Sequence, residues 1–355
     1  MLEKYYIIVK TLLSENLSFL KINHYCSMVF LVFGYLLANL SASDHDRSIL
    51  WEAELNDFSQ FSYAKALGKM WADFEAVKGQ SIVPGKHKKI ALRISCEAGI
   101  GLCTPHPLVK AVIEQLEKKG WQKEQITIIG QKGQDLRESH YLPHLGSGKS
   151  ALFYGVSVVA LDDGEFWDKN WFYSSSLPIR NYNFGSVIFD FEQSDIEDKK
   201  RYSWLPSNLL TDVDFWINLP VLMDQSTLGV QGAVLNGSLL QVSHNSRFLE
   251  SEHEGPVAAV EIAMIPELQR TWVLTIASLE KYQFIGGPFF NAHYSASAPK
   301  LWLSSNPLLP DFEIWKRFNK HRAERELPMI PTPAIFPMGE QIGLGKYEPS
   351  EIRSL

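Results

Sequence analysis

The sequence predicts a layered α/β protein, in which a mostly parallel sheet is flanked by helices and carries irregular β additions in its middle. Three observations predict this class. The 355 residues are 45% apolar and 21% charged, a composition typical of a globular protein with a sizeable core. Residues 89–130 show a strand, a helix and a strand in succession, which implies a parallel pair joined by a right-handed crossover. Strand and helix patterns then alternate as far as residue 326.

The strand–helix–strand unit is the clearest pattern in the chain. The apolar runs at Lys89–Ser95 and Ile126–Gly130 are typical of buried strands. Between them, Thr104 is a good N-cap residue, Pro105 suits the first position of a helix and Gly120 suits its left-handed C-terminal cap. The buried face of this helix is predicted to consist of Leu108, Val109, Val112, Ile113 and Leu116.

The other elements follow from the same kinds of pattern. An apolar stripe at helical spacing, closed by Gly79, predicts a helix over residues 62–78. Residues 257–270 and 311–326 are also helical in pattern, the second with Trp315 and Phe318 facing inward. Further strands are expected at residues 156–162, 186–191, 213–220, 272–279 and 300–305.

The N-terminal segment resembles a secretory signal. Residues 25–43 carry no charge, and Met28–Leu40 is an apolar core too short to span a membrane comfortably, followed by small residues near Ala42 and Ser43. About two dozen residues precede this core, which a start at Met28 would explain; an uncleaved anchor is the alternative. We expect export to the periplasm or cell envelope, with membrane contact only if the segment is uncleaved.

Three regions are therefore expected along the chain. Residues 1–43 form the signal peptide or membrane anchor, and residues 44–88 form an N-terminal lead-in with one helix, of which residues 44–60 are polar, acidic and loose. Residues 89–355 form the α/β domain, which is long enough for two lobes.

Charge and cysteine usage exclude several classes of function. The net charge of −6 gives no electrostatic reason to expect nucleic acid, and the basic run at residues 86–89 fits a solvated strand entry. No Cys/His spacing indicates a metal site, and the sequence leaves any cofactor unknown. Cys96 and Cys103 could pair across the loop between them in an oxidising compartment, and Cys96 is equally consistent with a buried inert thiol.

Four candidate site residues lie in the loop before the first predicted crossover helix and in its first turn. The loop from Cys96 carries Gly99 and Gly101 and enters the helix at Thr104, so free N–H groups there would favour an anion. His106, in the first turn, could contact the same ligand or move protons. A plain strand-to-helix turn is the alternative.

Two later loops also follow predicted strands and contain glycines beside polar residues. After the strand that ends near Asn218, Asp224 lies among Gly229, Gly232 and Asn236, and could act as a general base, an orienting acceptor or a helix cap. After the strand at 272–279, the pair Gly286 and Gly287 permits close approach to a ligand, or only a turn. All three loops follow predicted parallel strands, and the carboxyl edge of such a sheet is where ligand crevices form.

The segments at residues 90–129 and 213–237, the "IGGPFFN" loop and the tail from Arg322 together resemble domain-of-unknown-function family 362, over about residues 90–355. The resemblance implies a bacterial or archaeal protein, often exported, for which no general activity is established. Relatives fused to iron–sulfur modules exist, but the cysteines for a cluster are missing here.

The chain departs from the family pattern at charged positions. The second motif of the family reads near "PVLKDHxxxGVTGALKN", and here Met223 and Leu235 stand at the lysines and Gln225 at the histidine. Gly130-Gln131 replaces Asp-Arg, and Arg93-Ile94-Ser95 replaces Lys-x-Asn. An anionic substrate would lose much of its attraction to such a site.

These observations leave three hypotheses open. The first is an exported family-362-like protein that binds an unknown small molecule at the strand-end crevice, with altered or lost catalysis. The second is an active enzyme in which Asp224 and His106 carry out acid–base chemistry on a small polar substrate. The third is an interaction or structural protein of the envelope, because the chain has ten tryptophans and an aromatic-rich middle.

Overall fold

The computed structural model describes residues 48–179 and 199–355. The predicted signal or anchor at residues 1–43 and the predicted strand at 186–191 lie outside the described residues. The strands are β1 (Ile49–Glu54), β2 (Ile90–Ile94), β3 (Ile126–Gly130), β4 (Leu152–Phe153), β5 (Val156–Ala160), β6 (Phe172–Ser174), β7 (Tyr202–Trp204), β8 (Phe215–Leu219), β9 (Met223–Gln225), β10 (Gly229–Gln231), β11 (Trp272–Ser278), β12 (Tyr282–Gln283), β13 (Ser295–Ala296), β14 (Lys300–Ser304) and β15 (Glu351–Ser354). The helices are α3 (Gln60–Lys78), α4 (His106–Lys118), α5 (Gly133–Glu138), α7 (Ser207–Leu210), α8 (Ala233–Gly237), α9 (Ser246–Leu249), α10 (Glu254–Ala263), α11 (Pro266–Thr271), α12 (Leu308–Ala323) and α13 (Ile335–Gln341). Short 3-10 turns are η1 (Ile100–Leu102), η2 (Lys123–Gln125), η3 (Leu161–Asp163), η5 (Leu239–Gln241) and η6 (Ala292–Tyr294).

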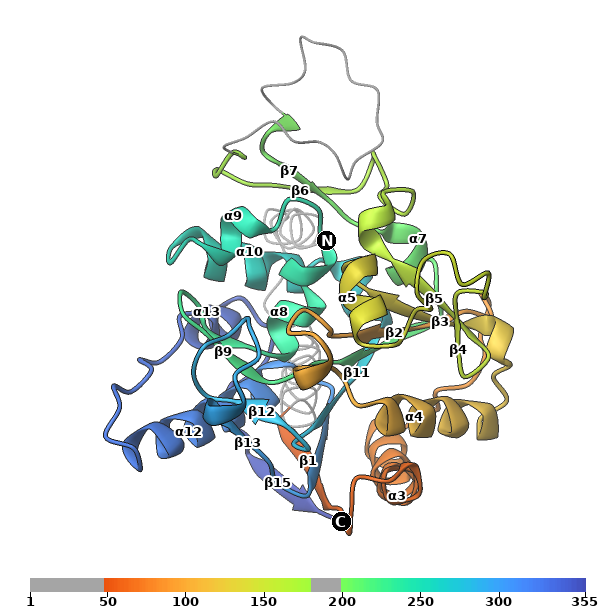
Figure 1. Ribbon diagram of the computed structural model, residues 1–355, viewed down its shortest axis with the longest axis horizontal. Coiled ribbons are helices and arrows are strands. Elements are labelled where there is room, and N and C mark those ends of the chain that lie inside the picture. Colours follow the sequence, from red (N-terminus) through yellow and green to blue (C-terminus); the bar gives the residue numbers. More distant parts are fainter. Residues whose placement is uncertain (1–47, 180–198) are drawn as a thin grey trace, which may run out of the picture. The chain divides into compact units, whose positions relative to one another are not determined.

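The core of the fold is a nine-stranded sheet with the order β15-β1-β14-β11-β8-β2-β3-β5-β4 (Figure 1). Its five neighbouring strands β11, β8, β2, β3 and β5 are parallel, while β14 and β4 join antiparallel. Two smaller sheets, β10-β9-β12-β13 and β6-β7, are added to it. The predicted class, a mostly parallel sheet flanked by helices with irregular β additions, is confirmed.

The alternation of side chains along the strands divides the core into two layers. On β2, Ile90, Leu92 and Ile94 pack in the layer that holds α3 and α4. Ala91 packs in the opposite layer, which contains residues of α8, α10, α12 and α13. Figure 1 shows these two groups of helices on opposite sides of the sheet. Burial of both faces explains why the parallel strands are apolar almost throughout.

The ends of the predicted helices are confirmed in part. Gly120 follows α4 with φ of 94°, and the N–H groups of Gly120 and Trp121 donate to Glu117 O and Leu116 O, which is a Schellman motif. The expected N-cap is wrong: α4 begins at His106 after Pro105, and the Thr104 side chain does not cap it.

Two other predictions about elements are wrong. Residues 44–60 were expected to be loose, but residues 49–54 form β1, which pairs with both β14 and β15. Trp51 on β1 packs edge-on against Phe74 of α3, with ring centroids 5.4 Å apart, so this strand belongs to the core. The helix expected at 257–270 is divided into α10 and α11, because Pro266 cannot continue the helical hydrogen bonds of α10.

None of the helices in the two described stretches is both long enough and apolar enough to cross a membrane.

Helix α8, which covers the strand ends of the sheet, is held by a buried carboxylate. Asp311 of α12 is fully buried and accepts hydrogen bonds from Ala233 N at 2.5 Å and Val234 N at 2.9 Å. Burial outweighs these hydrogen bonds and raises the pKa of Asp311 to about 7. The side chain therefore titrates near neutral pH while it anchors the helix.

This pKa predicts a pH-dependent loss of stability. The folded protein binds the Asp311 proton more tightly than the unfolded chain does, so the contribution of this group is complete below its ordinary pKa of 3.8 and is lost as pH rises through about 7. Each pKa unit corresponds to about 1.4 kcal/mol, so the loss should amount to a few kcal/mol. Urea unfolding at several pH values measures it.

The matched variants are Asp311→Asn, which does not titrate, and Asp212→Asn at an exposed position. At low pH, the Asp311→Asn protein should be less stable than wild type by about 1 kcal/mol, because one of the two α8 N–H groups loses its acceptor. As pH rises, this variant should lose less stability than wild type does. Parallel pH profiles for wild type and Asp311→Asn would contradict the raised pKa.

Candidate functional site

Three loops meet at one edge of the sheet. They follow β2, β8 and β11, which are neighbouring parallel strands in the order β11-β8-β2, so their carboxyl ends lie together. Leu102 of the first loop packs with Val221 and Met223 of the second. Lys281 of the third donates a hydrogen bond to Gly101 O at 2.7 Å. The expected convergence of the three loops at one sheet edge is confirmed.

A cavity of about 290 Å³ lies between the first and third loops. Its walls include chemically active side chains from three separate segments of the chain, together with prolines and backbone. The side chains that bear chemistry are Cys103, His106, His140, Glu280 and Lys281. A cavity of this kind, with a few convergent polar groups at the carboxyl edge of a parallel sheet, is the usual form of a small-molecule site.

His106 is held in one orientation within this wall. Its Nε2 lies 2.7 Å from the carbonyl oxygen of Ser139, and its ring packs edge-on against Tyr141 and Phe153. Because a carbonyl only accepts, Nε2 must carry a proton, which leaves Nδ1 of the neutral ring as an acceptor. Burial lowers the pKa of His106 and so favours that neutral form.

Glu280 and Lys281, from the loop after β11, contribute a carboxyl group and an ammonium group to the cavity wall. Tyr63 donates a hydrogen bond to Glu280 Oε2 at 2.9 Å, and burial raises the pKa of Glu280 above its ordinary range. The Lys281 ammonium, bonded to Gly101 O, also lies 5.1 Å from the centre of the Phe290 ring. The cavity therefore offers both hydrogen-bond donors and acceptors at neutral pH.

The expected anion site at the start of α4 is not supported by the local geometry. Pro105 and Pro107 have no N–H, and the Thr104 N–H donates to Ser95 O at 2.8 Å. The Thr104 hydroxyl donates to Leu219 O at 2.6 Å and accepts from Ser95 N, so it links β2 to β8. Gly99 has φ of 71° and Gly101 lies against Phe290, which accounts for these glycines by turn geometry and close packing.

Asp224 is not among the residues that line this cavity. Its carboxylate accepts hydrogen bonds from Gly286 N at 3.1 Å and Gly287 N at 2.9 Å, and lies 3.4 Å from Arg322 Nη2. Asp224 thus holds the double-glycine turn in place by accepting from two backbone N–H groups, and it is not the helix cap that was one of the expected alternatives. Asp224 and His106 are not brought to a common cavity wall.

Of the other predicted ligand-binding residues of the second loop, Asn218, Gly232 and Asn236 are buried and Gly229 is half-buried. Asn218 donates to Ala233 O at 2.8 Å and accepts from Asn236 Nδ2 at 2.7 Å. Gly232 lies against the Asp311 carboxylate, and Gly229 has φ of 84° where β10 begins. Asn218, Asn236 and Gly232 shape the approach of α8 to the sheet, whereas Gly229 lies against Pro333 and Ile330, and none of the four lines the cavity.

A buried polar row crosses the sheet on the face below α8. It consists of Arg93, Asn218, Thr275 and Ser304, which are register partners on β2, β8, β11 and β14. All four are at most 1% exposed. The sequence does not predict this row, although each residue is a polar exception at an inward position of an apolar strand.

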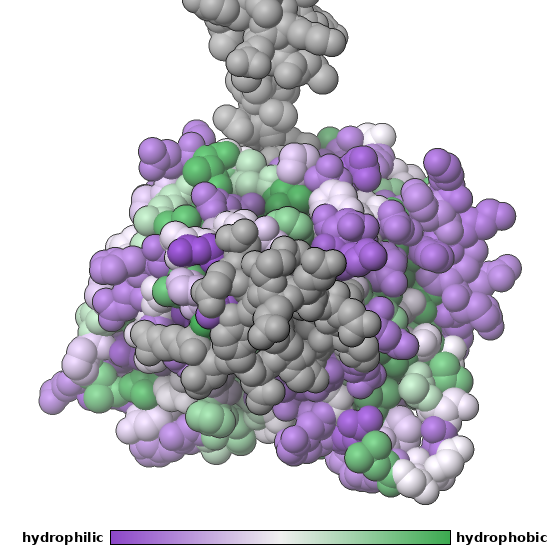
Figure 2. Space-filling model, turned by 90° about the horizontal axis from the view of Figure 1, so that it is seen from above, coloured by the Kyte–Doolittle hydropathy of each residue, from purple (hydrophilic) through white to green (hydrophobic). Residues whose placement is uncertain are grey.

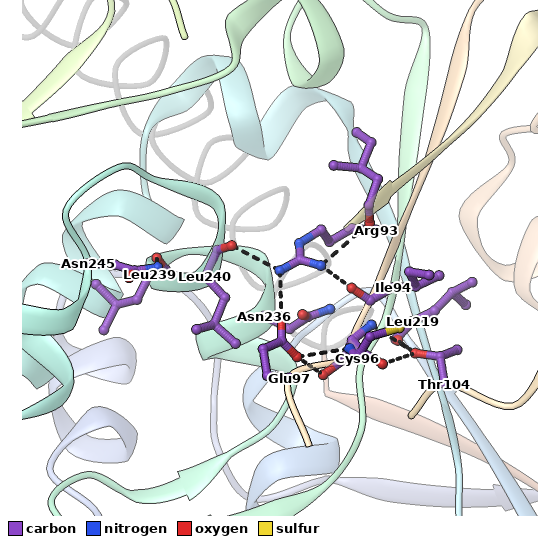
Figure 3. Close-up of polar contacts among 12 residues, drawn as sticks. Arg93, Ile94, Cys96, Glu97, Thr104, Leu219, Asn236, Leu239, Leu240 and Asn245 are labelled. Atoms are coloured by element: carbon purple, nitrogen blue, oxygen red, sulfur yellow. Dashed lines mark hydrogen bonds and ion pairs between the residues drawn. The ribbon is translucent and has the colours of Figure 1, made fainter. Parts of the chain in front are cut away.

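Arg93 is the charged member of the row (Figure 3). Its guanidinium donates to the carbonyl oxygens of Ile94 and Leu240 and forms an ion pair with Glu97, with 3.2 Å between Nη2 and Oε1. Glu97 also accepts from Ser95 Oγ at 2.6 Å and from Cys96 N at 3.0 Å. Arg93 is fully buried, so the positive charge is used within the protein and is not available to a ligand.

Larger hollows lie elsewhere on the described surface. One of about 700 Å³ lies beside α9 and reaches Ile179, which borders a stretch that is not described. Another of about 510 Å³ is a depression over α3 and α4. Neither lies at the strand ends, and the described residues contain no group of three or more His, Cys, Asp or Glu that could hold a metal ion.

The Arg93–Glu97 pair predicts strong coupling between two substitutions. Glu97→Gln leaves the buried Arg93 guanidinium without a negative partner. Arg93→Met leaves the Glu97 carboxylate without a positive partner. Each should lower the free energy of unfolding by about 3–5 kcal/mol. The double variant should recover most of that loss, because no uncompensated charge remains buried. Urea unfolding of the four proteins measures the coupling; losses that simply add would show that the pair is not an interacting unit.

No protein-family model matches the chain, and no curated protein matches it. A crystal structure of a Thermotoga maritima protein, determined as a Northeast Structural Genomics Consortium target, is similar over 63% of this chain and 51% of that chain. The sequences are 12% identical and the TM-score is 0.34, a likeness too low to carry an argument about fold or function. The match spans only about half of that protein's length.

Proposed function

We propose that this chain is an exported α/β protein of the family-362 type that binds a small polar molecule in the cavity between the β2–α4 and β11–β12 loops, with altered or lost catalysis. The observation that carries the proposal is the convergence of His106, His140, Glu280 and Lys281 around one hollow at the carboxyl edge of the parallel sheet. A volume of about 290 Å³ suits a small metabolite.

The groups in the wall indicate what such a ligand would carry. Lys281 offers a donor and a positive charge, and neutral His106 offers an acceptor at Nδ1. Glu280 accepts or donates according to its protonation. A ligand with both hydrogen-bond donors and acceptors, such as a small hydroxy or amino acid, is complementary to this set.

Altered or lost catalysis is supported by the positions that carry charge in the resembled family. Met223 and Leu235 are fully buried in apolar clusters. At Gly130, a Cβ would lie 2.5 Å from the Leu136 side chain, so an acidic residue would collide with the core there. At these positions the residues present pack against the apolar core and can neither move protons nor bind anions.

The two alternatives are less well supported. Acid–base catalysis by Asp224 and His106 requires both groups to reach one substrate, and Asp224 is engaged with Gly286, Gly287 and Arg322. An interaction or structural role would be favoured by a continuous apolar surface. On the face seen in Figure 2, apolar residues are interrupted by hydrophilic ones.

A thermal-stabilisation screen of the full-length protein with small hydroxy acids, amino acids and phosphate tests the binding proposal. At about a hundredfold excess over its Kd, a ligand should stabilise the folded protein by about 2.7 kcal/mol. His106→Gln and Lys281→Met should remove most of this stabilisation, because each deletes a polar group of the cavity wall.

The matched controls are His87→Gln and Lys86→Met, which change exposed side chains that precede β2, at the end of the strand opposite to its loop. They should leave the stabilisation intact. A hit that survives both cavity substitutions would place the ligand elsewhere, and the absence of any hit would count against a binding role. Loss of binding in Asp224→Asn, with the folded structure retained, would favour the catalytic alternative.

Export is tested separately by sequencing the N-terminus of the protein recovered from its native cell envelope. The proposal expects a mature chain that begins near Ala42 or Ser43, because the small residues there suit a signal peptidase. Recovery of a chain that begins at Met1 would reject cleavage and favour the anchor.

A further inference from the structure

We propose that Cys96 and Cys103 form a reversible disulfide across the neck of the β2–α4 loop, and that this bond removes the Cys103 sulfur from the cavity wall. This inference is independent of whether the cavity binds a ligand. Both cysteines are free thiols in the structure, Cys96 buried and Cys103 partly exposed.

The backbone brings the two residues opposite each other. Thr104 N donates to Ser95 O at 2.8 Å, and Ser95 N donates to the Thr104 hydroxyl at 2.9 Å. Ser95 and Thr104 therefore close the loop as a hydrogen-bonded pair, and Cys96 and Cys103 are the next residues inward. Closing the loop at Ser95 and Thr104 brings the next residue on each side, Cys96 and Cys103, near each other, and a disulfide needs Cα atoms within about 7 Å.

The surroundings of the two sulfurs agree with this proximity. The Ser139 hydroxyl lies beside both thiols and lowers the pKa of each, although it forms no hydrogen bond of ordinary geometry. Burial is the larger effect and raises the pKa of Cys96 and Cys103. Negative charge on Cys103 would raise the pKa of Cys96 further.

The bond would form by exchange with a small external disulfide. The Cys103 thiolate, which is the more accessible, attacks one sulfur of the external disulfide and releases one external thiolate. The Cys96 thiolate then attacks the Cys103 sulfur and expels the second. Two protein thiols are oxidised, one external disulfide is reduced to two thiols, and the two protein protons end on those thiols. Because burial keeps both groups protonated at neutral pH, the reaction should be slow and should accelerate as pH rises.

The bond would alter one side of the cavity. Cys103 lines the cavity next to Pro105 and His106. A bond to buried Cys96 would draw the Cys103 sulfur inward and tie η1 to the end of β2. The loop that carries Gly99 and Gly101 would then have fewer conformations available.

Mass spectrometry of the full-length Cys26→Ser protein tests the proposal, because that substitution leaves only this pair of cysteines. After treatment with oxidised glutathione and trypsin, the peptide covering residues 94–110, which contains both cysteines, should be lighter by two hydrogen atoms and resistant to alkylation. Reduction before alkylation should restore two modified thiols. Hydrogen exchange at residues 99–102 should be slower in the oxidised protein.

Cys103→Ser and Cys96→Ser in the same background are the controls, and neither should yield the lighter peptide. In Cys96→Ser, Cys103 should instead accumulate as a mixed disulfide with glutathione, because no second thiol can resolve it. A stable mixed disulfide at Cys103 in the protein that retains both cysteines would overturn the proposal. So would two thiols that remain fully open to alkylation after oxidation.

Discussion

The parallel pairing of β2, β8 and β11 is the constraint on which the site depends. Three strands that run in the same direction and lie side by side must end at one edge, so the loops that follow them have to share a small volume. Contacts among Gly101, Leu102, Met223 and Lys281 are the direct consequence. Any substitution that shifted the register of β8 would separate these loops and dismantle the cavity.

The same edge contains two chemically different zones. On the α4 side, His106 and Lys281 surround an open hollow. On the α8 side, Arg93, Asn218 and their neighbours form a polar layer that is enclosed by protein. Several atoms of that layer lack a hydrogen-bond partner among the described residues, including Arg93 Nε and Asn236 Oδ1. Unsatisfied buried groups of this kind cost about 1–3 kcal/mol each, so these atoms lower the stability of the folded protein.

A large part of this architecture is accessible from the sequence because it is encoded locally. The apolar runs of β2, β3 and β8 and the glycine that ends α4 each lie within a few residues, and all were predicted. The N-terminus of α4 was misplaced because Thr104 has a distant partner, the Leu219 carbonyl, which competes with the local cap. β1 was missed because its partners β14 and β15 lie near the other end of the chain.

The site itself was predicted only in part, for the same physical reason. His106 was found because it follows a recognisable strand and loop, whereas His140, Glu280 and Lys281 join it only through the fold. The role of Asp224 depends on the backbone of Gly286, 62 residues later, which no local pattern reveals. The polar row likewise requires the register of four strands, because each member is visible in the sequence only as a single polar residue in an apolar strand.

The central claim is that ligand recognition occurs at the strand-end cavity and not in the larger hollow beside α9. Each hollow is lined by two histidines that can report on binding. His106 and His140 line the strand-end cavity, and His244 and His253 line the hollow beside α9. The most direct measurement is a titration of the full-length protein with a stabilising compound, monitored by the NMR signals of the imidazole rings. The account predicts that the signals of His106 and His140 move with ligand concentration while those of His244 and His253 stay fixed. The reverse pattern would contradict it.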